Sequence, residues 1–98
     1  MSANEDLNSA STVFAALGNS VRLRILLMLM DSKKPLHITA VSNNLEMDYE
    51  GVYWHIELLR DAGLLQVYEV GRSRVLSPMN SELIREMIGK ARTASKKR

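Results

Sequence analysis

The sequence contains no cysteine among its 98 residues. This absence excludes disulfide bonds, thiolate metal sites and thiol-based catalysis. Aromatic residues are also scarce, at 5% of the chain, so a hydrophobic core has to be built from aliphatic side chains and methionine. The β-branched and aromatic residues that favour strands form a strand-like stretch only in the predicted hairpin. The composition of the rest of the chain therefore favours helices.

Long apolar runs are absent as well. No run approaches the roughly 20 residues that span a bilayer, and the opening segment MSANEDLNSAS is polar and acidic, unlike a secretory signal. We therefore expect a soluble, cytoplasmic protein with no membrane partner. The length suits a single domain.

The spacing of apolar residues predicts five helices and one β-hairpin. Asp48 is a suitable N-cap before one of the helices, as is Ser20 before another, and Gly63 is placed to end a helix in the left-handed conformation. Gly71 supplies the positive φ of a tight hairpin tip. Helices are expected at 9–17, 21–30, 38–44, 49–62 and after Asn80 or Ser81, and strands at 64–70 and 74–77.

A short helix, a turn, a second helix and a hairpin follow one another between Leu36 and Pro78. This order is typical of a winged helix-turn-helix, in which the second helix enters the DNA major groove. The predicted fold class is mainly α with a small β-hairpin, ordered as four helices, two strands and a last helix. We expect residues 1–8 to be a disordered N-terminus, 9–92 the domain, and 93–98 a basic tail.

Positive charge is concentrated in the second part of the chain. Residues 1–59 hold four basic and seven acidic side chains, whereas residues 60–98 hold nine basic and four acidic ones. A one-sided basic surface is the electrostatic signature of a polyanionic partner. The alternative for the C-terminal charges alone is a solvated basic tail.

Three motifs resemble segments of the ArsR-type winged helix-turn-helix transcription regulators: FAALGNSVRLRILLML, LHITAVSNNL and VYWHIELLRDAGLL. The third is similar to that family's Val-x-x-His-Leu-x-x-Leu-x-x-Ala-Gly-Leu-Val pattern. It is the most specific because five of its positions are in register, namely His55, Leu59, Ala62, Gly63 and Leu64. The resemblance extends over about 13–91 and implies a homodimer, paired through its first and last helices, on a pseudo-palindromic DNA site.

Two departures from the family pattern affect the expected function. Many of these regulators sense metals through cysteines, or through His and Asp on the last helix, and this chain has neither. We therefore expect no metal and no cofactor. Tyr53 and Trp54 stand where the family more often has small polar and basic residues, a pattern closer to archaeal members.

The candidate DNA-contacting residues lie in three places. Thr39 opens the third helix, whose exposed N–H groups suit a phosphate. Arg72 and Arg74 flank the hairpin tip, with Ser73 between them. The family resemblance implies that such a tip reaches the adjacent minor groove, whose potential attracts arginine, or the DNA backbone; the alternative is a solvated tip. The fourth helix contributes the remaining candidates, Tyr49, Glu50, Tyr53, Trp54, Glu57 and Arg60.

Alternatives stay open for several of these residues. The acidic side chains of the fourth helix suit an ordinary solvated face as well as a base-contacting one. Trp54 suits either the sugar-phosphate backbone or packing against the third helix. Arg60 suits non-specific phosphate contact.

Apolar residues on the first and last helices are expected to pair two copies of the chain, and the alternative for the last helix is packing within its own domain. These candidates are Val13, Phe14, Leu17, Leu83, Ile84, Met87 and Ile88.

The sequence therefore predicts a homodimeric transcription regulator, acting as a repressor, that binds double-stranded DNA sequence-specifically. We do not expect an enzyme, since no paired carboxylates, Gly-rich phosphate loop or Ser-His-Asp arrangement is found. The alternatives are a winged helix used for protein–protein interaction and a non-specific architectural DNA-binding protein. Binding by phosphate neutralisation weakens steeply with salt, which separates DNA binding from apolar protein pairing.

Overall fold

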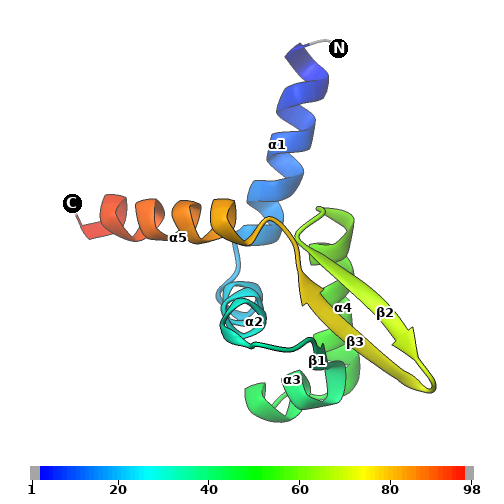
Figure 1. The fold of residues 1–98 in the computed structure, drawn as a ribbon. Coiled ribbons are helices and arrows are strands. Elements are labelled where there is room, and N and C mark those ends of the chain that lie inside the picture. Colours follow the sequence, from blue (N-terminus) through cyan, green and yellow to red (C-terminus); the bar gives the residue numbers. More distant parts are fainter. Residues whose placement is uncertain (1–2, 97–98) are drawn as a thin grey trace.

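The structure is a computed structural model that describes residues 3–96. It confirms the predicted fold class, with one short strand added before the third helix (Figure 1). The elements are α1 (Ala3–Leu17), α2 (Ser20–Asp31), β1 (Leu36–His37), α3 (Ile38–Leu45), α4 (Tyr49–Asp61), β2 (Leu65–Val70), β3 (Ser73–Pro78) and α5 (Ser81–Lys96).

The core forms around α2, which is apolar over most of its circumference. Ile25, Leu26 and Leu29 of α2 are fully buried. They pack with aliphatic side chains from every other helix and from the sheet, and this single cluster holds the elements together. The other buried members are Ala16, Ile38, Val41, Val52, Ile56, Leu59, Leu64, Leu65, Leu76 and Ile84.

The three strands form an antiparallel sheet in the order β1-β3-β2. β1 pairs Leu36 with Leu76 and His37 with Val75, which ties the start of α3 to the middle of β3. The sequence did not predict β1 because two residues are too few to show an alternating pattern. We call the β2–β3 hairpin the wing; its tip is a two-residue turn with φ of 61° at Gly71.

Two helices are longer than the sequence predicted. α1 begins at Ala3 instead of Ser9, and α5 continues to Lys96 instead of giving way to a tail at 93. In α1 the apolar stripe extends upstream, because Leu7 lies two turns before Phe14 on the same face. The parts of the expected terminal segments at 1–2 and 97–98 lie outside the described residues.

The N-cap of α2 also differs from the prediction. Asn19, not Ser20, caps this helix, and its Oδ1 accepts hydrogen bonds from the backbone N–H groups of Val21 and Arg22 at 2.9 and 3.1 Å. The amide of asparagine is one of the strongest N-caps, which places Ser20 inside the first turn.

α1 and α5 project from the body of the molecule in different directions, and the described chain ends lie at their far tips (Figure 1). α2, α3, α4 and the sheet make up the compact part. In the described part of the chain no single helix is long and apolar enough to cross a membrane; α1 and α2 meet that test only as a pair, across an 88° bend.

Candidate nucleic-acid interface

The turn between α3 and α4 fixes the direction of α4. Glu46 adopts a left-handed φ of 55° at the end of α3, and the buried Ser42 hydroxyl donates to the Met47 carbonyl. Asp48 then caps α4, since its Oδ1 accepts from the Gly51 N–H at 2.9 Å. This confirms the predicted Asp48 cap and presents the first turns of α4 at the surface.

Tyr49, Tyr53 and Arg74 form one cluster where the wing meets α4, and we call it the Tyr–Arg cluster. The rings of Tyr49 and Tyr53 stack with centroids 6.2 Å apart. Arg74 donates from Nη1 to the Tyr49 hydroxyl at 3.0 Å, and its guanidinium carbon lies 4.6 Å from the centre of the Tyr53 ring. Candidates predicted on two different elements, the fourth helix and the hairpin, therefore lie together.

The surroundings of Arg74 keep its guanidinium charged and oriented. The hydrogen bond to Tyr49 is the main cause that raises the pKa of Arg74, and the nearby Tyr49, Tyr53 and Glu69 side chains add to it. Glu69 faces Arg74 across the two strands, with its Oε1 3.9 Å from Nε. Arg74 thus points back onto α4 from the wing.

Arg72 and Ser73 have different settings from Arg74. Arg72 is exposed at the wing tip, and within residues 3–96 it makes no hydrogen bond or ion pair. Ser73 begins β3, paired with Val70. Arg72 is therefore the wing cation available for an external anion.

Acidic side chains occupy much of the exposed surface of α4. Glu50 is exposed in the first turn. Glu57 is partly buried and forms an ion pair with Arg60 through Oε2, while its Oε1 is buried without a hydrogen-bond partner in the described part of the chain. The pair leaves neither Glu57 nor Arg60 as an isolated charge; contact of either residue with DNA stays a prediction.

Trp54 is 59% exposed and lies beside two residues that join α4 to the α1–α2 junction. Its ring meets His55 edge-on at 5.0 Å, and the Arg22 guanidinium carbon lies 5.9 Å from its centre. Contact of Trp54 with a sugar-phosphate backbone stays a prediction.

Arg22 is the buried cation behind this surface. It donates from Nε to the Ala16 carbonyl at 2.7 Å and from Nη2 to the Ala15 carbonyl at 3.2 Å. Its Nη1 lies 3.0 Å from His55 Nδ1, and because arginine only donates, the histidine nitrogen accepts. Burial, and secondarily the charge of Arg22, lower the pKa of His55.

Thr39 is exposed in the first turn of α3, as predicted. The residue at the N-cap position of α3 is His37, and it makes no side-chain hydrogen bond to the helix. The N–H groups of this turn are therefore free of a side-chain cap, which suits the expected phosphate contact.

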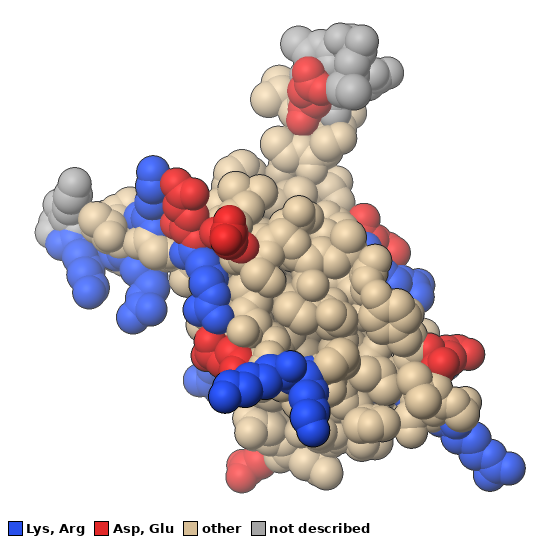
Figure 2. Space-filling view, viewed as in Figure 1, with Lys and Arg blue, Asp and Glu red and all other residues tan. Residues whose placement is uncertain are grey.

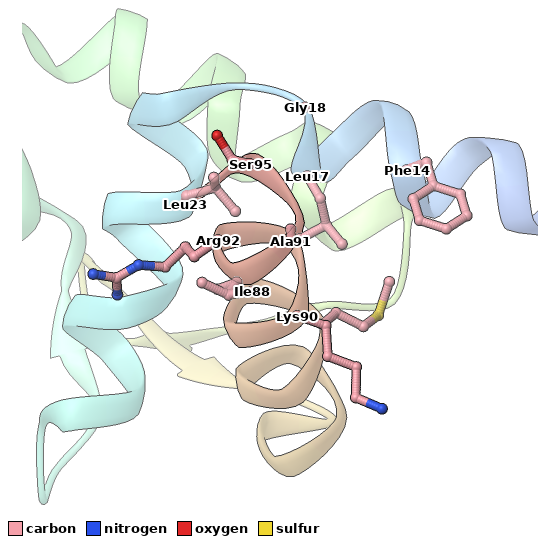
Figure 3. A pocket seen from close by; sticks show the side chains of 10 residues that line it. Phe14, Leu17, Gly18, Leu23, Ile88, Lys90, Ala91, Arg92 and Ser95 are labelled. Atoms are coloured by element: carbon pink, nitrogen blue, oxygen red, sulfur yellow. The ribbon is translucent and has the colours of Figure 1, made fainter. Parts of the chain in front are cut away.

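An apolar groove of about 690 Å³ lies between α1 and α5 (Figure 3). Phe14 and Leu17 enter it from α1, and Ile88 and Ala91 from α5, with Leu23 of α2 nearby. Phe14, which lines the groove, is 64% exposed, and Leu83 of α5, which is not part of the groove lining, is 56% exposed. Val13, Leu17, Met87 and Ile88 are half-buried against the core.

Ile84 does not belong to this surface, although the sequence grouped it with the pairing residues. It is 1% exposed and is a member of the core cluster. Ile84, together with the half-buried Met87 and Ile88, therefore packs α5 against its own domain. The neighbouring Leu83 points away from the core.

Charge is unevenly distributed over the face shown in Figure 2. Lys and Arg gather along α5 and mark the wing tip, while Asp and Glu lie among them on the body. Arg85 of α5 is paired with Asp31 of α2 at 2.7 Å. Within residues 3–96 no three His, Asp or Glu side chains are close enough together to bind a metal ion.

Comparison with known proteins places the fold. The profile of a family described as a helix-turn-helix domain matches residues 17–68, just over half of the chain. HlyU from Vibrio cholerae is 25% identical, with a TM-score of 0.73 and coverage of 95% of this chain and 97% of that one. None of the curated proteins matches by sequence.

Two further solved structures have the same fold. One is a homodimeric winged helix-turn-helix DNA-binding domain of a possible ArsR-family regulator from Mycobacterium bovis, with 19% identity, a TM-score of 0.78 and coverage of 98% and 89%. The other is an ArsR-like transcriptional regulator from Rhodococcus sp. RHA1, with 21% identity, a TM-score of 0.71 and coverage of 97% and 85%. The chain shares their winged helix-turn-helix architecture over almost its whole length.

Proposed function

This chain belongs to the helix-turn-helix domain family, and on that premise we propose that it is an ArsR-type transcription regulator that binds double-stranded DNA as a homodimer. In this proposal α4 is the recognition helix, α3 is the positioning helix and the wing contacts the adjacent groove. The protein works in the cytoplasm without a metal or other cofactor, and the Tyr53–Trp54 pair relates it to archaeal regulators of this type.

The arrangement of α3, α4 and the wing is the observation that supports this function most. Asp48 caps the start of α4, where Tyr49 and Trp54 are exposed and Tyr53 is half-buried against the core. The side chain of Arg74 reaches the same helix from the wing. A helix in this setting, flanked by a wing cation such as Arg72, has the groove-binding geometry of winged helix-turn-helix proteins.

The groove between α1 and α5 supports the homodimer. Phe14 and Leu83 are large apolar side chains with little burial in the single chain, and a second copy would cover both at once. Two-fold pairing of the same patch is the simplest closed arrangement. The homodimeric neighbour from Mycobacterium bovis has the same fold over 98% of this chain.

A homodimer would present two recognition helices to two half-sites of one duplex. Such a protein covers its DNA site and blocks other proteins from it, so we propose that it acts as a repressor. Sequence-specific contact by Tyr49 and Tyr53 is part of this proposal.

Protein–protein interaction is the second candidate function, and the acidic side chains of α4 favour it. Glu50 and Asp61 are exposed on that helix, and they would oppose the approach of phosphate. A winged helix of this kind would bind a basic or apolar protein surface instead of DNA.

Binding to DNA in a salt series tests the proposal. The protein is used to enrich duplexes from a random library, and the enriched duplex and a shuffled one are then titrated by fluorescence anisotropy at 50–300 mM salt. We expect tighter binding to the enriched duplex and a fall of log K with log salt of about 0.9 per phosphate contact. Failure to bind either duplex at low salt would overturn the proposal, and equal affinity for both would indicate an architectural protein.

A further inference from the structure

Arg74 and Arg72 are separated by one residue of the wing, yet their contacts differ. Arg72 is exposed and makes no hydrogen bond or ion pair within the described residues. Arg74 has its guanidinium shared among the Tyr49 hydroxyl, the Tyr53 ring and the Glu69 carboxylate. The two arginines are therefore not equivalent cations.

The register of the wing explains the difference. Arg74 is paired with Glu69 and lies on the same face of the hairpin as Leu76 and Leu65. That face packs towards the body, since Leu65 and Leu76 are buried. Arg74 is thus turned inward onto α4, while Arg72 lies in the tip and extends away from it.

We propose that Arg74 is a positioning residue that holds Tyr49 and Tyr53 as the base-contacting surface of α4, and that the Tyr49 hydroxyl is thereby set to donate to an acceptor on a base edge. This inference rests on the proposed DNA-binding function. It assigns to Arg74 a role in specificity, in place of the minor-groove or phosphate contact expected of a wing arginine.

The hydrogen bond from Arg74 favours a donor role for the Tyr49 hydroxyl. Arginine has no acceptor, so the Tyr49 oxygen uses a lone pair for Arg74 Nη1. The hydroxyl proton is then left for another partner. In the major groove the acceptors are N7 and O6 of guanine, N7 of adenine and O4 of thymine, whereas the cytosine edge offers the N4 donor. The base contacted by Tyr49 is therefore expected to be guanine, adenine or thymine.

Stacking restricts the remaining freedom of the two rings. Tyr53 is covered by the Arg74 guanidinium at 4.6 Å and stacks on Tyr49 with an interplanar angle of 12°. Cation–π contact and stacking each add to the preference for this arrangement. Substitution of Arg74 therefore removes a contact that orients each of the two tyrosines, while both side chains remain present.

The test compares Arg74→Ala and Tyr49→Phe with the matched control Arg72→Ala, using the enriched and shuffled duplexes in the same salt series. Arg72→Ala should lower the slope of log K against log salt by the amount of about one phosphate contact, and it should weaken binding to both duplexes equally. Arg74→Ala and Tyr49→Phe should leave the salt slope unchanged and reduce the preference for the enriched duplex about tenfold. Circular dichroism of each variant checks the fold.

A second selection identifies the base. Tyr49→Phe should admit cytosine at one position of each half-site where the unaltered protein excludes it. The inference is overturned if Arg74→Ala lowers the salt slope as Arg72→Ala does, or if Tyr49→Phe keeps the full preference. In both cases the unaltered protein still binds DNA; absence of its binding would instead overturn the proposed function itself.

Discussion

Arg22 on α2 donates from Nη1 to Nδ1 of His55 on α4, across 3.0 Å. The same guanidinium binds the carbonyls of Ala15 and Ala16 at the end of α1. One buried side chain therefore connects the helix proposed to pair two copies with the helix proposed to enter DNA. The contact requires an unprotonated Nδ1 on His55.

Acidification should destabilise the fold through His55. Because the folded state lowers the pKa of this histidine below the 6.5 of an unfolded chain, the unfolded state binds more protons as the pH falls. The contribution is fully present above pH 6.5 and is lost as the pH falls through the lowered pKa. Urea unfolding between pH 5 and 8 measures it.

His55→Gln is the control for the pH series, since its amide oxygen can accept from Arg22 and does not titrate. We expect the stability of this variant to depend less on pH below 6.5, which is the reference pKa of the histidine. Identical pH dependence in the two proteins would contradict the assignment.

Removal of the Arg22 guanidinium should lower the free energy of unfolding more than most single substitutions do. The side chain is only 8% exposed, and Arg22→Met leaves the Ala16 carbonyl and His55 without this donor. We expect the free energy of unfolding to fall by about 3 kcal/mol. Arg24→Met, on the exposed side of the same helix, should change it by no more than about 0.5 kcal/mol; similar losses in both variants would contradict the role of Arg22.

Leu83 and Ile84 are adjacent on α5 and should respond in different ways. Ile84→Ala creates a cavity in the core and should lower the free energy of unfolding by about 2–4 kcal/mol. Leu83→Ala leaves the core intact and should weaken self-association. Analytical ultracentrifugation over a concentration series, together with urea unfolding, separates the two effects.

A substitution in the proposed dimer interface on α1 can be compared with a matched substitution on the wing. Phe14 is 64% exposed on α1 and Val70 is 60% exposed on β2. Phe14→Glu should shift the protein to monomers in sedimentation, because a charge cannot be buried without a partner. Val70→Glu should leave the mass unchanged, and a dimer that survives Phe14→Glu would place the interface elsewhere.

The Asp48 cap should contribute measurably to stability. Asp48→Ala removes the acceptor of the Gly51 N–H and should cost about 1 kcal/mol in urea unfolding. Asp48→Asn keeps an acceptor at the same place and should cost much less. Equal losses in the two variants would indicate that charge, not capping, is what matters at this position.

Helix caps, turn residues and the spacing of apolar residues, which are all local features of the sequence, were enough to predict most of the fold. Asp48 capping and the left-handed Gly63, with φ of 78°, depend on residues within one turn of each other, so the sequence predicted both. The apolar stripe of α5 also predicted a helix, but it did not distinguish Ile84 from Leu83. That distinction depends on where α5 leaves β3 and meets the core.

The sequence pattern could not predict contacts between residues that are far apart in the chain. Tyr49 and Arg74 are 25 positions apart and Arg22 and His55 are 33 apart. Their meeting depends on the wing register and on the packing of α2 against α4. The quoted motifs contain Arg22 and His55, and the sequence also proposed Tyr49 and Arg74 as DNA-contacting candidates, but it did not show which of these residues meet.

Hydroxyl-radical footprinting of the protein on its enriched duplex shows directly whether a dimer places two recognition helices on one DNA molecule. We predict two protected half-sites whose centres lie about one helical turn, roughly 10–10.5 base pairs, or a whole number of turns apart. Protection of a single half-site, or uniform weak protection along the duplex, would contradict binding by a homodimer to two half-sites.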